Sequence, residues 1–205
     1  MTKQPADRRA ETRVPILPAI ADRWSPRAFD PDATLDREQI VGLLEAARWA
    51  ATWGRRQPVR FVVGLREPGG DATFETLTGL LSRGNAYAMS AGALILVCTD
   101  EGDDANTARY AHVDAGAAMA NMAVEAVSRG LITHPMAGFD VDGARAAFAV
   151  PSVVAPVAVV AVGSLADPGT VEPEIAERDA AARQRSPLQE VAFAGSWGLP
   201  WSAGD

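Results

Sequence analysis

Apolar and polar positions follow helical and extended periods in turn along the chain. Apolar residues recur at helical spacing over residues 37–50, directly behind Asp36 and Gln39, which have the spacing of a capping box. This pattern predicts an amphipathic helix. Residues 59–65 and 91–99 are short apolar runs, and each predicts a strand. Because the second run is continuously apolar, it is expected at the centre of a sheet.

The remaining segments are shorter or less regular. Further helices are expected at 19–23, 72–83 and 140–148, an extended or irregular segment at 131–139, a last strand at 155–164 and an extended polar tail from residue 167. The order of elements predicts a mixed α/β fold with about three or four core strands. The chain has neither a G-x-G-x-x-G sequence after a strand nor a P-loop sequence, so a Rossmann or P-loop protein is not indicated.

The longest predicted helix covers residues 109–130, is rich in alanine, lacks proline and closes on a glycine. Its polar residues Asp114, Asn121 and Glu125 fall on one narrow line, so the helix should be buried on most of its circumference. Charged residues inside the segment argue against a membrane span. The small residues would let a second copy approach closely, while a crowded monomer core fits the pattern equally well.

Composition narrows the classes of partner. The 205 residues fit one domain, and a net charge of −7 makes nucleic acid and an anionic membrane unexpected partners. The single cysteine, Cys98, lies in an apolar run and is expected in the core, and with two histidines the chain offers little for a metal. Residues 1–13 are polar and lack an export signal, so we expect a flexible arm, a single domain over 14–205 and a cytoplasmic protein.

The candidate chemistry begins with a short basic motif. Arg23, Ser25 and Arg27 occupy alternate positions, so in an extended backbone their side chains point the same way. A hydroxyl between two guanidiniums can satisfy several oxygens of one phosphate. An exposed basic loop would have the same sequence.

A second basic pair, Arg183 and Arg185, again occupies alternate positions far along the chain. In an acidic protein the two clusters could converge on one phosphate, although each taken singly reads as surface charge. Neither His112 nor His134 belongs to a recognisable catalytic set, and no serine has an evident triad. A chain poor in catalytic side chains but equipped with basic clusters suggests that an anionic cofactor carries the reaction.

These segments resemble the nitroreductase family of flavoproteins. Residues 23–63 read RWSPRAFDPDATLDREQIVGLLEAARWAATWGRRQPVRFVV, similar to the family opening of Arg-x-Ser-x-Arg/Lys-x-Phe followed by a helix and Ala-Pro-Ser-Ser-x-Asn-x-Gln-Pro-Trp. The similarity continues through Gly84-Asn85, the Arg-Gly-Leu that ends the long helix, and three segments with the sequences HPMAGFD, PVAVVAVGS and ERDAAARQRSPLQEVAF. It extends from about residue 16 to the C-terminus.

The resemblance implies an α+β fold, a three-layer α/β/α sandwich with a mixed, mainly antiparallel sheet, and a homodimer that pairs through its long central helices. It implies FMN at two dimer-interface sites, with Thr52 and Gln57 contributed by the partner subunit and a backbone N–H near Ala137 facing flavin N5. The implied cofactor-binding residues are Arg23, Trp24, Ser25, Arg27, Thr52, Trp53, Arg55, Gln57, Asp114, Pro135, Met136, Ala137, Gly138, Arg183 and Arg185. The flavin-borne chemistry needs no catalytic side chain and no metal.

The activity implied is ping-pong hydride transfer from NADH or NADPH through flavin N5 to a nitroaromatic, a quinone or a similar small conjugated acceptor. Two departures bear on it: Arg55 stands where the family has asparagine, and Val59 stands where it has tryptophan. Arg55 could favour an anionic flavin or substrate, meet the 2′-phosphate of NADPH, or point into solvent. The alternatives are a flavin-sequestering protein with little turnover and a flavin-free scaffold, against which the basic pairs weigh.

Overall fold

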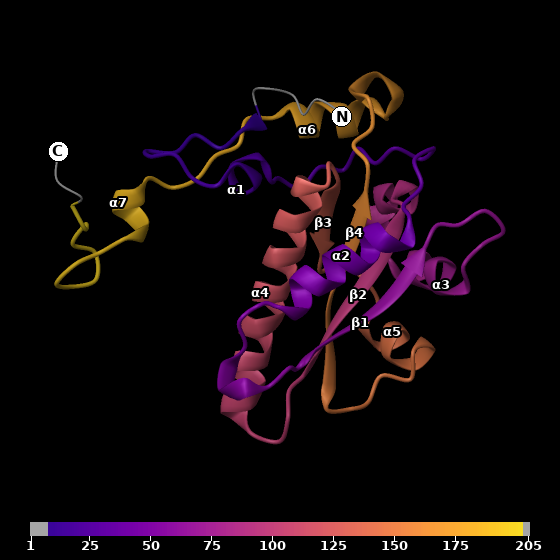
Figure 1. Ribbon diagram of the computed structural model, residues 1–205, viewed down its shortest axis with the longest axis horizontal. Coiled ribbons are helices and arrows are strands. Elements are labelled where there is room, and N and C mark those ends of the chain that lie inside the picture. The colour runs from indigo at the N-terminus through magenta and orange to yellow at the C-terminus, as the bar shows by residue number, and fades with distance from the viewer. Residues whose placement is uncertain (1–7, 203–205) are drawn as a thin grey trace.

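A computed structural model describes residues 8–202 and is built on a four-stranded sheet (Figure 1). The strands are β1 (Val59–Leu65), β2 (Ala93–Asp100), β3 (Ile132–Met136) and β4 (Val154–Gly163), in the order β1-β2-β4-β3. Each of the three pairings is antiparallel, with Val63 opposite Ile95, Ile95 opposite Val160 and Pro135 opposite Val160. β3 contains a proline and lies at an edge, where the missing N–H costs no ladder hydrogen bond.

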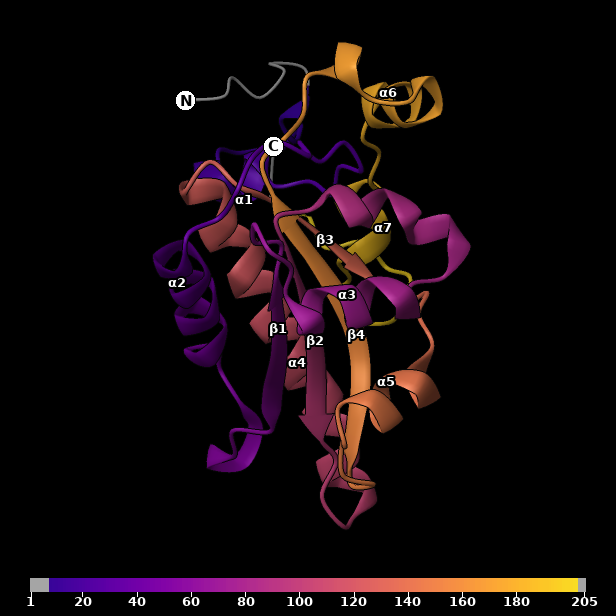
Figure 2. The ribbon, with the colours of Figure 1, turned by 90° about the vertical axis from the view of Figure 1, so that its right-hand side faces the viewer.

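Helices cover both faces of the sheet and make three layers; Figure 2 looks onto one face of the sheet, with one layer of helices in front of the strands and another behind them. The side chains of β2 show which helices cover which face, because alternate side chains of a strand point to opposite faces of the sheet. Ile95 and Val97 pack with α2 (Arg37–Arg48) and α4 (Ala105–Ser128). The side chains between them pack with α3 (Ala72–Leu80) and α5 (Val141–Ala147). This confirms the α+β sandwich expected from the sequence.

Local signals place the helix ends. Asp36 and Gln39 form the expected capping box, with the Asp36 carboxylate accepting from Gln39 N at 2.7 Å and the Gln39 amide accepting from Asp36 N at 3.0 Å. Cys98 is buried in the core as expected, and burial raises the pKa of its thiol to about 11.

The central helix α4 starts four residues before the predicted boundary, at Ala105 rather than at 109. Asp104 caps it, accepting from the amides of Asn106 and Thr107, a signal that the alanine-rich pattern had concealed. Its C-terminal end follows the expectation: Gly130 has a φ of 73°, and the next amide, Leu131 N, returns to Ala126 O at 2.8 Å.

The prediction that α4 is buried on most of its circumference is wrong for the single chain. Only one stripe packs inward, and the opposite side leaves Gly116 and Ala120 exposed and Val113 60% exposed. The polar line does not mark that exposed side. Asn121 donates to Ala46 O of α2 at 3.1 Å, and Glu125 pairs with Arg129 at 2.7 Å. The core of the single chain therefore accounts for the buried alanines of α4 but not for the exposed Gly116 and Ala120.

The other segments are short. α1 (Pro18–Asp22) precedes the basic motif, and 3₁₀ turns are η2 (Trp53–Arg55), η3 (Arg83–Ser90) and η4 (Pro168–Thr170). The predicted 72–83 helix is thus two pieces, since α3 ends at Leu80 and a 3₁₀ segment follows. The tail is not simply extended, because it contains α6 (Pro173–Ala180) and α7 (Leu188–Val191); Pro173 at the first helical position was the missed signal.

Part of the expected N-terminal arm lies outside the described residues. From Arg8 onward the chain packs on the domain: the Arg8 guanidinium lies 4.2 Å from the centre of the Trp24 ring, and Ala10 N donates to Ala21 O at 2.9 Å. Within residues 8–202, no helix combines the length and hydropathy that crossing a bilayer would need.

Candidate functional site

The two basic clusters that are distant in sequence come together beside α1. The Arg23 guanidinium lies 3.3 Å from Ser25 Oγ, and Arg183 Nη2 donates to Arg23 O at 2.9 Å. Burial lowers the pKa of Arg23, and the positive charge of Arg185 lowers it further. Burial likewise lowers the pKa of Arg183, followed by the charges of Arg23, Arg185 and Arg8. These like charges would be stabilised by an anion among them.

Arg183 has a different role from Arg185, because its side chain bonds to distant parts of the protein backbone. Its Nη1 donates to Arg8 O at 2.6 Å and to Ala21 O at 2.9 Å, besides the bond to Arg23 O. One side chain thus ties the N-terminal segment, the end of α1 and the basic motif to the tail. Arg185 is exposed and donates only to the adjacent Gln184 O within the described chain, so its remaining donors are available to a ligand.

Arg27 and Trp24 do not join this basic group. The chain bends at Arg27, and its guanidinium carbon lies 4.8 Å from the centre of the Tyr87 ring. The expectation that Arg23, Ser25 and Arg27 point the same way holds only for the first two. Trp24 is 7% exposed and is covered by Arg8.

Asp179 of α6 fixes the bend, and sequence reasoning missed it. Its Oδ2 accepts from the consecutive amides of Arg27 at 2.7 Å and Ala28 at 2.9 Å. No spacing could have revealed this contact, because the partners lie 152 and 151 residues away along the chain. A carboxylate holding two backbone N–H groups is a strong anchor for the motif.

The segment from Pro135 to Gly138 lies next to the basic motif. His134 Nδ1 is 2.8 Å from Pro26 O, so the ring nitrogen that carries the proton donates to that carbonyl. Pro135 and Ala137 are exposed, whereas Met136 points into the core between them, as strand alternation requires. Gly138 O accepts from Ser82 N at 3.0 Å and from the Asn85 amide at 2.8 Å, which fixes the end of the segment.

The predicted residues of the 52–57 segment gather at the other end of α4. Asp114 is 5% exposed, and its two oxygens lie 3.1 and 3.2 Å from Trp53 N. The Trp53 ring stacks on Tyr110 with centroids 4.9 Å apart and planes 12° apart. Tyr110, one turn before Asp114 on α4, is a site residue that sequence reasoning missed.

A cavity of about 290 Å³ lies under this segment, between the end of α2, β1 and α4. Thr52, Gln57 and Asp114 are among its polar lining residues, and Leu44, Val59 and Phe61 are among its apolar ones. Val59, which replaces the tryptophan of the family pattern, therefore lines this space.

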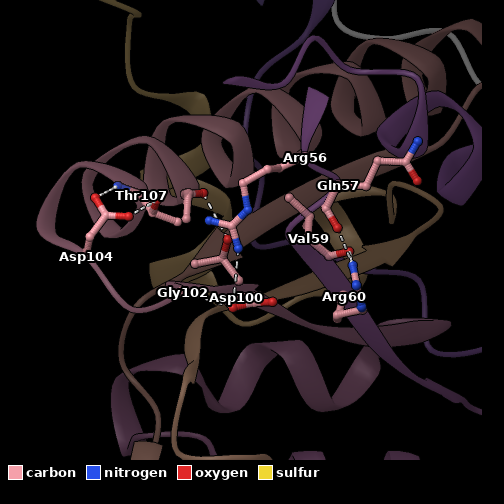
Figure 3. Close-up of polar contacts among 10 residues, drawn as sticks. Arg56, Gln57, Val59, Arg60, Asp100, Gly102, Asp104 and Thr107 are labelled. Atoms are coloured by element: carbon pink, nitrogen blue, oxygen red, sulfur yellow. Dashed lines mark hydrogen bonds and ion pairs between the residues drawn. The ribbon is translucent and has the colours of Figure 1, made fainter. Parts of the chain in front are cut away.

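Arg56 ties the segment to the end of β2 (Figure 3). Its Nη2 lies 3.5 Å from Asp100 Oδ1, and the same oxygen accepts from Gly102 N at 2.9 Å. Gly102 has a φ of 65°, and a Cβ there would come within 2.6 Å of Thr107 and 3.1 Å of Arg56. Only glycine fits both the backbone conformation and the space. In the same view Arg60 donates to Gln57 O and to Val59 O.

The structure therefore divides the predicted cofactor residues into two groups. The motif, the tail arginines and residues 135–138 lie toward the C-terminal end of α4, and the 52–57 segment lies by its N-terminal end (Figure 1). α4 has 24 residues, so at 1.5 Å per residue its ends are about 36 Å apart. Within one chain the two groups therefore lie toward different ends of this helix. Among the described residues, no group of three or more His, Cys, Asp or Glu side chains is placed to hold a metal.

The chain is similar to known proteins over most of its length. Residues 20–164 match the nitroreductase family. The chain is 29% identical to a crystal structure of an oxidoreductase containing FMN, with a TM-score of 0.83 over 96% of this chain and 100% of that one. It is 25% identical to a nitroreductase family protein from Clostridium difficile 630, with a TM-score of 0.65 over 85% of this chain and 94% of that one.

The fold and the match define a protein of the flavoprotein nitroreductase class, and this chain belongs to the nitroreductase family. It is also 60% identical, over 147 residues, to an uncharacterized 15.4 kDa protein of Mycolicibacterium smegmatis. That similarity covers 69% of this chain and 99% of the relative.

Proposed function

We propose that the protein is an FMN-dependent oxidoreductase that takes hydride from NADH or NADPH and passes it to a nitroaromatic, a quinone or a similar small conjugated acceptor. The family and the FMN-containing structural neighbour support a flavin oxidoreductase in general. The observation that carries the proposal for this chain is the convergence of Arg23, Arg183 and Arg185, where burial and neighbouring positive charge lower the pKa of Arg23 and of Arg183.

The residues present fit FMN. Arg23, Ser25 and Arg185 supply guanidinium and hydroxyl donors for its phosphate, and Arg183 holds the backbone that carries them. The exposed edge at Pro135 and Ala137 offers a flat surface and backbone groups beside which the ring would lie. Trp24, Arg27 and Met136 were also predicted to contact the cofactor, but their side chains pack against Arg8, Tyr87 and the core, respectively.

The site is completed by a second copy. The exposed strip of α4, with Val113, Gly116 and Ala120, lies between the two groups of residues. When two such helices pair about a two-fold axis in antiparallel sense, each places its N-terminal end beside the C-terminal end of the other. Thr52, Trp53, Arg55, Gln57 and Asp114 of one subunit would then close the cofactor site of its partner.

When bound, FMN supplies the hydride-accepting and hydride-donating chemistry, so the protein needs no acid or base of its own. Arg23, Ser25 and Arg185 bind and orient the phosphate. Thr52 and Gln57 donate hydrogen bonds toward the polar edge of the ring, and the backbone near Ala137 and Gly138 offers N–H groups. Trp53 and Tyr110 would narrow the space in which the nicotinamide and then the acceptor bind.

The visible spectrum of the purified protein tests the proposal. A flavin absorption band in the blue that NADH or NADPH bleaches without oxygen, and that an acceptor then restores, is the expected result. A yellow protein that neither nucleotide bleaches would show that the chain sequesters flavin instead. A colourless protein that does not bind added FMN would rule out both functions.

A further inference from the structure

Two neighbouring arginines of the 52–57 segment have opposite surroundings. Arg56 is half-buried and paired with Asp100. Arg55 is exposed and, within residues 8–202, makes no hydrogen bond or ion pair. The flanking arginines are also engaged, Arg48 with Glu45 and Arg60 with backbone carbonyls. Arg55 is therefore the free cation of this segment.

The backbone presents Arg55 outward. Gly54 and Arg55 have φ values of 62° and 61°, and the second is unusual because a residue with a Cβ rarely adopts this region. The anchors on either side maintain it, since Trp53 N is held by Asp114 and Arg56 is held by Asp100. A strained residue whose side chain bonds to nothing in its own chain points to a partner outside it.

An aromatic surface begins two residues before this cation, at Trp53. Trp53 and Tyr110 are stacked, yet they remain 41% and 37% exposed, so the pair is not a core contact. Tyr110 is fixed by α4 and Trp53 by Asp114, which makes the pair a rigid wall. A planar aromatic ring can stack against such a surface with little loss of its own freedom.

We propose that Arg55 and the Trp53–Tyr110 pair make this site selective for planar aromatic acceptors that carry a negative charge. The inference rests on the proposed function and names its substrate class. For a nitrobenzoate the balanced step is ArNO₂ + NAD(P)H + H⁺ → ArNO + NAD(P)⁺ + H₂O, in which the nucleotide supplies the hydride and solvent supplies the proton. Arg55 binds the carboxylate and takes no part in the electron transfer.

The test compares 4-nitrobenzoate with 4-nitrobenzamide, which has nearly the same shape and no charge. Arg55→Gln should lower the ratio of kcat/KM for benzoate over benzamide by about tenfold, through KM, because a charge-assisted hydrogen bond to the carboxylate is lost. Arg55→Lys should keep part of the preference. Trp53→Ala should raise KM for both acceptors and leave their ratio unchanged.

Arg37→Gln is the matched control, since it removes an equally charged, exposed arginine on α2 that pairs with Glu67 and lies outside the site. It should leave the ratio as in the wild type. An unchanged ratio in Arg55→Gln overturns the inference. So does a loss of NADPH preference over NADH with the acceptor ratio intact, which would place Arg55 on the 2′-phosphate.

Failure of the proposed function is recognised separately. If neither nucleotide bleaches the flavin, the affinities of the two nitro compounds are measured by quenching of tryptophan fluorescence in wild type and Arg55→Gln. Tighter binding of 4-nitrobenzoate that disappears in Arg55→Gln supports the anion site even in a protein without turnover. Equal binding of both compounds in the two proteins overturns it.

Discussion

At the scale of single residues, the arginines of the proposed cofactor site have two roles. Some are available to bind the cofactor phosphate, and others hold backbone segments in place. Arg183 donates to three backbone carbonyls, of Arg8, Ala21 and Arg23, whereas Arg185 is left open to a ligand. Both match the same basic pair of the family pattern. Their positions in the fold give them different energetic roles.

Alanine substitutions should separate these roles. Arg183→Ala removes charged hydrogen bonds that tie three segments together, and should lower the free energy of unfolding by about 2 kcal/mol as well as weaken FMN binding. Arg185→Ala should weaken FMN binding about tenfold with the unfolding free energy unchanged, because it removes one charged contact to the phosphate. Urea unfolding and FMN titration measure the two effects. Equal stability losses in both variants would contradict the division.

Protonation of His134, next to the basic motif, makes the stability of the folded protein depend on pH. Burial lowers the pKa of its imidazole more than the hydrogen bond to Pro26 raises it. Below the ordinary value of about 6.5 the unfolded chain therefore binds a proton that the folded chain resists. The stability contributed by neutral His134 is present above that value and is lost as the pH falls below it.

Thermal unfolding of the wild type should thus show a falling Tm as the pH is lowered from about 7 to about 5. His134→Asn keeps a donor near the Nδ1 position but cannot be protonated, and should flatten part of this slope. His112→Gln serves as the control, because His112 is exposed and pairs with Glu101 on the surface. An identical slope in wild type and His134→Asn would show that other groups cause it.

At the scale of elements, α4 has two faces with different uses. The inward stripe packs against the sheet and α2, and the outward strip with Val113, Gly116 and Ala120 is exposed in the structure of residues 8–202. A Cβ on Gly116 would meet no atom within 4 Å. An exposed strip of small and apolar residues has no evident role in a monomer. It would allow a second helix to approach closely.

Gly116→Leu should therefore leave the fold intact and prevent dimerisation, since the added side chain has room in the monomer and none between two closely packed helices. Light scattering after gel filtration measures the mass, and far-UV circular dichroism checks the fold. Gly79→Leu on α3 is the control, because a Cβ there also meets nothing within 4 Å. A dimeric Gly116→Leu protein would move the interface away from this strip.

At the scale of the whole molecule, the predicted cofactor residues lie toward both ends of α4, and much of the tail lies away from the sandwich (Figure 1). Exposed apolar side chains accumulate there, with Trp197 92% exposed and Val191 61% exposed. A single chain with half-sites at opposite ends and an uncovered apolar tail is consistent with the proposed homodimer.

Mixing two defective proteins tests this arrangement directly. Arg23→Ala impairs the phosphate half, and Gln57→Ala impairs the half supplied by the partner. Subunit exchange between them should regenerate about a quarter of the wild-type sites, because each heterodimer contains one site with both halves intact. NAD(P)H oxidation with an acceptor measures it. The control is Arg23→Ala mixed with Arg23→Ala/Gln57→Ala, which can form no intact site. Equal activity in both mixtures would place the whole site in one chain.

Local sequence patterns were enough to predict the helices, strands and turns that depend mainly on neighbouring residues. The capping box at Asp36, the strand at 59–65, a helix within 140–148 and the glycine at 130 were all predicted, since each depends on neighbours within a few residues. The spacing of the basic pairs gave the candidate arginines, and the family resemblance added the sandwich.

Only the tertiary structure decided which of those residues meet and what each side chain does there. Asp179 reaches the amides of Arg27 and Ala28, Tyr110 stacks on Trp53, and Arg183 bonds to carbonyls rather than standing free. Such contacts join residues far apart in the chain, and their geometry is set by the packing of whole elements. The same holds for α4, whose composition indicated burial, while the packing of α2 and the sheet on one side alone left its other face open.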